Sequence, residues 1–251
     1  MTTISETHRY EATDELPEDY RASLIHLMTM QADSELAGGL GYVKWIGGAP
    51  TMKEKFLMAR IVRDEIGHAH MMYRLLSQLG IDVDRHIEEH QMGDRLDIFY
   101  YDIPTWNDLV MFNFLMDRGA GHQLVDAREC NYGPWARTIV RIEQEEAMHT
   151  HHGEEWVGRL AKEDPAGITE ALFTWWPRTL AIFGRSHSPK NEVYRRLGLK
   201  RRTNEEVREA FVEEVHSLLD EYGLPKPEYA AAEYEMSTGR KDVPEDPVPI
   251  G

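Results

Sequence analysis

Residues 61–76 read IVRDEIGHAHMMYRLL, and inside this stretch Glu65 and His68 stand three positions apart. The apolar residues of the stretch recur at three- and four-residue steps, which is typical of one buried face of a helix: Ile61, Val62, Ala69, Met72 and Leu76. Glu65 and His68 lie within that face, one helical turn apart. An ionised carboxylate that is buried without compensation costs several kcal/mol. Glu65 therefore predicts a buried partner, either a metal ion or a basic side chain.

The same Glu-x-x-His spacing occurs at two further places in the chain. Glu146 and His149 lie within the apolar stripe of their own helical segment and are expected to face a core. Glu213 and His216 lie off the stripe of theirs, so that this third pair is expected on a solvated face. Two Glu-x-x-His pairs thus remain as candidate metal ligands.

Each of the two remaining pairs is preceded by one inward-facing acid. Glu35 precedes Glu65 by 30 positions, and Asp117 precedes Glu146 by 29. Asp126 and Glu129 compete with Asp117 on its helix, but their spacings of 20 and 17 to the same Glu146 break the repeat. The sequence therefore predicts an internal repeat in two halves, each with an acid followed about thirty residues later by Glu-x-x-His.

Two further features accompany the acids. Gln31 stands four positions before Glu35, and Asn113 stands four positions before Asp117. Small residues also recur near the acids, and we expect them to leave room for a bound small molecule: Gly38, Gly39, Gly67 and Gly121.

One carboxylate from each of two helices, together with Glu-x-x-His from two others, is the ligand set of the ferritin-like di-metal bundles. Four carboxylates and two neutral imidazoles carry a charge of about −4, which two divalent ions balance. Mixed oxygen and imidazole ligands suit iron, with manganese as an alternative. The predicted metal ligands are Glu35, Glu65, His68, Asp117, Glu146 and His149, and the four carboxylates among them are the predicted catalytic residues.

Helical patterns dominate the rest of the chain, and convincing strand alternation is absent from the sequence. Long helices are expected over about 17–43, 51–80, 105–130 and 134–162, followed by helices from 165 and over 204–222. The intervening stretch 81–104 is less regular. The expected fold is an all-α, ferritin-like four-helix bundle with additional C-terminal helices. We expect a single domain over 1–251, with an irregular tail from about 223.

Composition excludes several classes of function. The 251 residues hold 28 Lys and Arg against 44 Asp and Glu, a net charge of −16, which argues against nucleic acid and anionic membrane surfaces as partners. The single Cys130 excludes an intrachain disulfide and cysteine-based metal clusters. No apolar run approaches the length of a membrane span, and residues 1–16 lack the regions of a signal peptide. A cytoplasmic protein is expected.

Several segments resemble the catalytic subunits of phenylacetyl-CoA epoxidases, a family of bacterial multicomponent di-iron mono-oxygenases. The similar segments are ADSELAGG (32–39), IGGAPT (46–51), RDEIGHAHMMY (63–73), LMDRGA (115–120), YGPWAR (132–137), EEAMH (145–149) and FTWWP (173–177). The resemblance covers about 17–225, and the six predicted metal ligands match the ligands of the family. It implies that two irons activate O₂ and that one oxygen atom enters the aromatic ring of an acyl-CoA such as phenylacetyl-CoA.

The resemblance also implies partners. A separate reductase is expected to supply electrons, because the chain has neither a flavin nor a nicotinamide fingerprint and holds one cysteine. A homologous structural subunit or a second copy of the chain is expected beside it. The family usually has a Glu and a Lys where this chain has Tyr42 and Ile61, and this paired replacement bears on substrate choice.

Two other features are interpreted as structural rather than functional. The basic run 190–202 could bind CoA phosphates or an acidic partner, but a solvated surface loop is favoured. His151 and His152 are expected at the surface or behind the metal ligands. Two other functions stay open: a non-catalytic structural or binding subunit of such a complex, and iron oxidation or storage.

Overall fold

The computed structural model describes residues 9–90 and 96–229, and these divide into two compact units. Of these, the first unit holds residues 9–90, 96–101 and 131–142, and the second holds residues 102–130 and 143–229. The C-terminal part of the expected tail, residues 230–251, lies outside the described residues.

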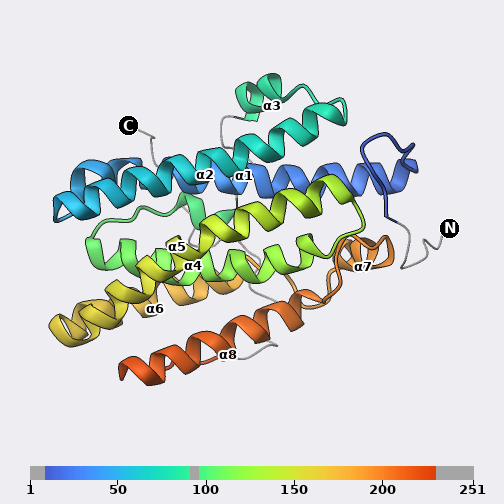
Figure 1. Ribbon diagram of the computed structural model, residues 1–251. Helices are drawn as coiled ribbons and strands as arrows, with labels where there is room; N and C mark the ends of the chain where they lie inside the picture. Colours follow the sequence, from blue (N-terminus) through green and yellow to red (C-terminus); the bar gives the residue numbers. More distant parts are fainter. Residues whose placement is uncertain (1–8, 91–95, 230–251) are drawn as a thin grey trace. The chain divides into compact units, whose positions relative to one another are not determined.

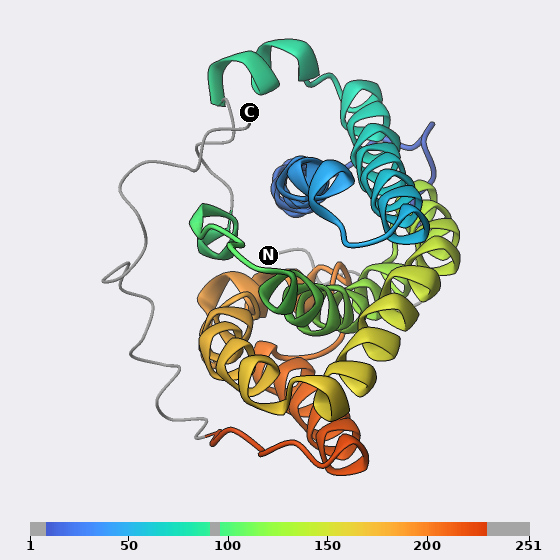
Figure 2. The same ribbon diagram turned by 90° about the vertical axis from the view of Figure 1, so that its left-hand side faces the viewer.

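The first unit is built on a pair of long helices, α1 (Glu18–Gly48) and α2 (Met52–Gln78), which pack along each other (Figure 1). The view in Figure 2 shows the same two helices side by side. The short helices α3 (Val83–His90) and η1 (Asp97–Tyr100) follow, within the stretch expected to be less regular. His86 Nε2 of α3 lies 3.0 Å from Asp33 Oδ1 of α1, and this hydrogen bond fastens α3 to the long pair.

The turn between α1 and α2 shows why these helices end where they do. α1 continues to Gly48, past the expected end at residue 43, because two glycines weaken a helix without stopping it. Ala49 leaves the helical region, with ψ at 146°, because the residue before Pro50 is sterically excluded from it. Thr51 Oγ1 then accepts a hydrogen bond of 3.2 Å from the Glu54 backbone N–H and caps α2.

The second unit contains α4 (Trp106–Arg128), α6 (Pro165–Ala181), α7 (Pro189–Arg196) and α8 (Asn204–Tyr222), and α6 and α8 pack on α4. The long helix α5 (Gly133–Glu163) contributes its residues from 143 onward. Reciprocal capping boxes at Thr105 and Thr203 start α4 and α8, as the sequence predicts. Gly223 ends α8 with φ at 70°, a left-handed conformation that glycine adopts without strain.

The predicted fold class, an all-α ferritin-like bundle with additional C-terminal helices, is confirmed. All the regular elements of the described residues are helices, apart from one isolated bridge between Tyr10 and Tyr132. Within the described residues, no helix is both long and apolar enough to cross a membrane.

Candidate metal centre

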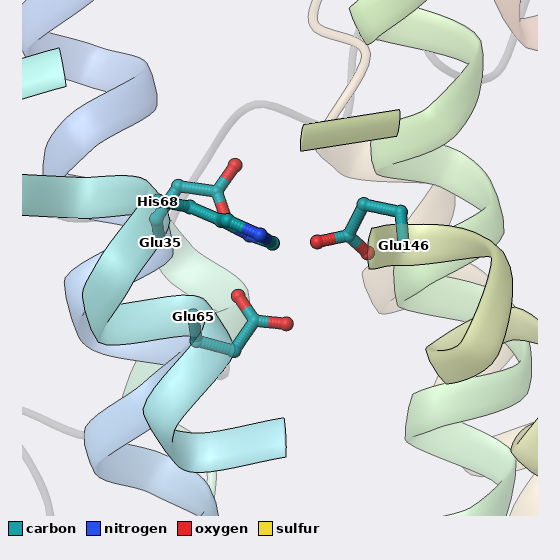
Figure 3. A group of neighbouring side chains, drawn as sticks. All are labelled: Glu35, Glu65, His68 and Glu146. Atoms are coloured by element: carbon teal, nitrogen blue, oxygen red, sulfur yellow. The ribbon is translucent and has the colours of Figure 1, made fainter. Parts of the chain in front are cut away.

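Three predicted ligands meet in the first unit. Glu35 of α1 is 7% exposed, Glu65 of α2 is 6% exposed, and His68 of α2 is fully buried. Their ligand atoms all lie within 4.8 Å of one another, and His68 Nδ1 is 3.5 Å from Glu35 Oε2 (Figure 3). We call these three residues the first half-site.

A glycine lets α1 approach α2 beside the first half-site. A Cβ added at Gly39 would lie 3.0 Å from Glu65 Cβ and 3.1 Å from Ile66 Cγ1, tighter than most real contacts. One at Gly38 would lie 3.6 Å from Glu65 Oε2 and 3.7 Å from the Phe99 ring. The expectation that these glycines leave room for a small molecule is wrong for Gly39, whose space is filled by α2 itself.

The other three predicted ligands meet in the second unit. Asp117 of α4 is 6% exposed, and Glu146 and His149 of α5 are 7% and 0% exposed. Their ligand atoms also lie within 4.8 Å of one another, and His149 Nδ1 is 3.3 Å from Glu146 Oε2. We call these three residues the second half-site.

The polar neighbours repeat as well. Gln31 Nε2 donates a hydrogen bond of 2.8 Å to Glu35 Oε1, and Asn113 Nδ2 donates one to Asp117 Oδ2. Both amides lie four residues before their acid, where a helix brings side chains together. The predicted internal repeat therefore extends from the acids to the groups that orient them.

His152 is one functional candidate that the sequence underrates. It is 4% exposed, so it is buried behind the second half-site, and its Nδ1 lies 2.9 Å from Asn113 Oδ1. Its neighbour His151 is exposed, as expected. The i,i+3 spacing from His149 to His152 was the available signal, since it places both imidazoles on adjacent parts of one helix face.

The donor set of each half-site fits a divalent metal ion. Ligands bound to one ion at about 2.0–2.2 Å lie roughly 3 Å apart, close to the 3.3 Å and 3.5 Å between carboxylate and imidazole. Two carboxylates and a neutral imidazole carry about −2, which one divalent ion neutralises. Buried oxygen and nitrogen ligands of this kind could bind iron, manganese or zinc.

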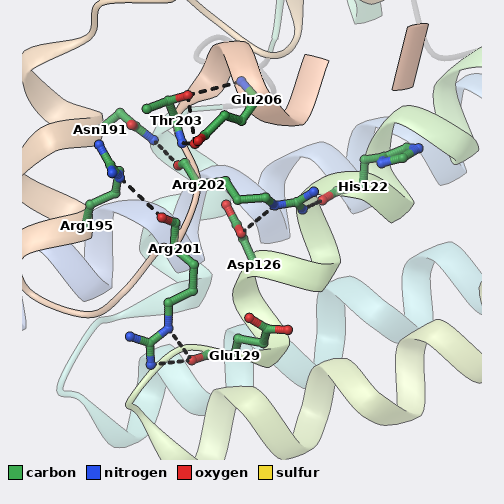
Figure 4. A network of polar contacts seen from close by, with 9 residues as sticks. All are labelled: His122, Asp126, Glu129, Asn191, Arg195, Arg201, Arg202, Thr203 and Glu206. Carbon is green, nitrogen blue, oxygen red and sulfur yellow. Dashed lines mark hydrogen bonds and ion pairs between the residues drawn. The ribbon is translucent and has the colours of Figure 1, made fainter. Parts of the chain in front are cut away.

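The competing acids on α4 do not join the second half-site. Asp126 is 1% exposed, and its Oδ1 accepts a hydrogen bond of 3.0 Å from Arg202 Nε (Figure 4). Glu129 is exposed and ends α4, where its backbone carbonyl accepts two bonds from Arg201. Asp126 is thus compensated by a guanidinium and needs no metal ion.

The discarded pair Glu213 and His216 also stays outside both half-sites. Glu213 is exposed, as expected. His216 is half-buried, which corrects the expectation in part: its ring stacks on Trp176 at 5.3 Å, and its Nε2 lies 3.1 Å from the Pro227 carbonyl oxygen. Burial lowers the pKa of His216.

The basic run 190–202 is only in part the solvated loop that the sequence favours, since residues 197–202 are not helical and Lys190, Arg195, Arg196 and Arg201 are exposed. Its first part is the helix α7, which Ser188 caps by accepting a hydrogen bond of 3.3 Å from the Asn191 backbone N–H. Its last part packs on α4, where Arg202 also donates a bond of 2.6 Å to the His122 carbonyl (Figure 4). Burial lowers the pKa of Lys200, although the nearby Asp126 carboxylate opposes the shift. Part of the run is therefore structural.

Tyr42 and Ile61, the two departures from the resembling family, are buried, with exposed fractions of 1% and 0%. Because Glu35 lies opposite His68 and Gly39 opposite Ile66, the antiparallel register brings Tyr42 to the level of Ile61. Tyr42 and Ile61 thus place an aromatic and an aliphatic side chain at one level of the α1–α2 pair.

Fold and site together define the class: an all-α protein whose buried carboxylate and histidine clusters could bind metal. The model of the phenylacetic acid catabolic protein family matches residues 1–243, and the chain belongs to that family. The chain is 30% identical to one of the subunits of the 1,2-phenylacetyl-CoA epoxidase of Escherichia coli (strain K12), over 90% of this chain and 75% of the relative. It is 27% identical to benzoyl-CoA oxygenase component B of Aromatoleum evansii, over 81% of this chain and 50% of that relative.

Proposed function

We propose that the two half-sites belong to one centre that binds two iron ions, within a single domain. The six predicted ligands would then be Glu35, Glu65, His68, Asp117, Glu146 and His149. The observation that carries the proposal is the repeat of the half-site itself: each half buries two acids and one imidazole with an oriented amide. Iron is favoured over manganese because the relatives are named as an epoxidase and an oxygenase, and non-haem iron held by histidine and carboxylate ligands is a common carrier of O₂ chemistry.

We infer that the chain is the oxygenase component that inserts one oxygen atom from O₂ into the ring of an aromatic acyl-CoA. Bound iron would supply the reduction and activation of O₂. The protein would contribute what its own residues do: the four carboxylates neutralise the ions, and the amides of Gln31 and Asn113 hold two of those carboxylates in place. Burial of all six ligands would limit access of water to the reaction.

The substrate is proposed to be an aryl-CoA thioester, with phenylacetyl-CoA first and benzoyl-CoA second, the compounds in the names of the two relatives. Tyr42 and Ile61 are buried on α1 and α2 where the resemblance implies a Glu and a Lys, so that preference between such thioesters is expected to differ from that of the family. Electrons would come from a separate reductase. We propose that the chain forms a stable complex with a homologous structural subunit or with a second copy of itself.

Isotope labelling tests this function. The iron-loaded chain, with a reductase and phenylacetyl-CoA under ¹⁸O₂, is expected to give a CoA product that carries one ¹⁸O atom. Glu65→Ala and His149→Ala are expected to abolish incorporation, whereas His151→Ala keeps it. A chain that binds no iron after reconstitution would instead be a structural subunit. Assembly into a hollow shell that oxidises Fe(II) without a thioester would point to iron storage.

A further inference from the structure

A chain of two hydrogen bonds runs behind the second half-site. Asn113, which is 1% exposed, donates from Nδ2 to Asp117 Oδ2 and faces His152 Nδ1 with its Oδ1 at 2.9 Å. His152 is itself 4% exposed. The metal candidate Asp117 is therefore linked through one amide to a second buried imidazole on α5.

The direction of both bonds follows from the chemistry of the groups. An ionised Asp117 only accepts hydrogen bonds, so the amide nitrogen of Asn113 must face it. The amide oxygen must then face His152, and this oxygen cannot donate. His152 Nδ1 therefore carries a proton. The Asp117 carboxylate fixes this Nδ1–H tautomer through the two hydrogen bonds of Asn113.

The packing around His152 keeps the ring in this orientation. The Trp106 ring meets the His152 ring edge-on at 6.3 Å, and Trp156 meets Trp106 edge-on at 5.1 Å. The next residue, Gly153, allows α5 to approach α4 closely: a Cβ there would lie 2.7 Å from both Phe114 N and Phe114 Cα. The link from His152 to Asn113 is thus built on a close helix contact.

Among the residues that the structure describes, no imidazole bonds to Gln31 as His152 bonds to Asn113. Met71 stands three residues after His68, where His152 stands three residues after His149. Gln31, which orients Glu35, is partly exposed, whereas Asn113 is buried. Two half-sites with the same ligand pattern therefore differ in how firmly one acid is held.

We propose that His152 is a positioning residue that fixes Asp117 through Asn113 and makes the second half-site the tighter of two unequal metal sites. This proposal rests on the proposed two-metal centre. Residues that orient metal ligands by hydrogen bonds typically change metal affinity about 10–100-fold when they are replaced.

Anaerobic titration with Co²⁺, followed by its visible absorption, tests the inference on the full purified chain. His152→Asn keeps an amide N–H near the position of Nδ1, whereas His152→Gln carries its amide one methylene further out. We expect two Co²⁺ per wild-type chain with unequal affinities. In His152→Gln the tighter site should weaken about 10–100-fold, and in His152→Asn it should stay within about threefold of wild type. His151→Gln, at the exposed neighbour, should match wild type.

The outcomes separate the two proposals. Equal affinities in the wild type, unchanged binding in His152→Gln, or equal loss in the Asn and Gln variants would overturn the positioning role and leave the two-metal centre standing. A wild-type chain that binds no Co²⁺ would overturn the proposed centre itself. Because the Asn and Gln variants are both polar amides at one position, a general loss of folding would affect them alike.

Discussion

Gln31 Nε2 donates a hydrogen bond of 2.8 Å to Glu35 Oε1, and the same relationship, amide to acid four residues later, recurs between Asn113 and Asp117. A neutral amide orients a carboxylate without supplying the counter-charge that a lysine or arginine would bring. Each oriented acid thus keeps its negative charge available for a metal ion. The paired amides therefore orient the acids and leave their charge to be balanced by a bound metal ion.

Removal of the first amide should weaken metal binding. Gln31→Leu removes the donor to Glu35 and is expected to lower the affinity of one of the two metal ions about 10–100-fold. Titration with Co²⁺ measures this affinity. The matched control is Ser34→Ala, since Ser34 lies on the exposed side of α1 and bonds to the Met30 carbonyl. Equal affinity in Gln31→Leu and wild type would contradict the role of the amide.

Gly153→Ala should destabilise the second unit. The new Cβ would meet the α4 backbone at Phe114 at 2.7 Å, which the backbone can relieve only by moving. Such overpacking typically costs about 1–3 kcal/mol. Gly41→Ala is the opposite control, because nothing lies within 4 Å and alanine favours a helix by about 0.5–1 kcal/mol. Urea unfolding measures the free energy of unfolding of the two variants. A Gly153→Ala variant as stable as wild type would contradict the close contact between α5 and α4.

Arg202→Met should be among the most destabilising changes outside the two half-sites. It leaves Asp126, which is 1% exposed, without the guanidinium that compensates its charge. Breaking a buried ion pair from one side costs about 3–5 kcal/mol. Arg196→Met, on the exposed end of α7, should stay within about 0.5 kcal/mol of wild type. Urea unfolding at pH 7 compares the free energies of unfolding of the two variants. Equal values for Arg202→Met and Arg196→Met would contradict the structural role of Arg202.

Acid should remove a stabilising contribution from Glu214. The hydrogen bond with His122, helped by Arg118, lowers the pKa of Glu214 from 4.5 to about 2 against partial burial. A depressed folded pKa gives stability that is present above about pH 4.5 and is lost as the pH falls toward 2. Glu214→Gln should therefore be less stable than wild type at pH 7, and the difference should shrink below pH 4.5. Urea unfolding from pH 7 to pH 3 measures the difference in the free energy of unfolding between wild type and Glu214→Gln, with the exposed Glu209→Gln as control. A difference that stays constant with pH would contradict the stabilising role of the ionised Glu214.

Much of the fold and of each half-site could be predicted from the sequence, because both depend on local spacing. Capping boxes at Thr105 and Thr203 mark helix starts within four residues of chain. The i,i+3 and i,i+4 steps bring Glu65 to His68 and Gln31 to Glu35 through helix geometry alone.

Other features depend on partners far along the chain and could not be predicted this way. Asp126 finds its counter-charge 76 residues later, at Arg202, so the sequence near Asp126 gives no sign of it. His152 and Asn113 are 39 residues apart, and only the close packing at Gly153 joins them. The helix α7, which was not among the predicted helices, could have been predicted. Ser188 followed by Pro189 is a recognisable helix start, although the basic residues that follow favoured a loop.

Metal analysis of the purified chain after anaerobic reconstitution with Fe(II) tests the central claim, that both half-sites together hold two irons. The account predicts two irons per wild-type chain, a marked loss in Asp117→Asn, and full retention in Asp126→Asn, whose buried acid is compensated by Arg202. A chain without iron, or loss of iron in Asp126→Asn with retention in Asp117→Asn, would contradict it.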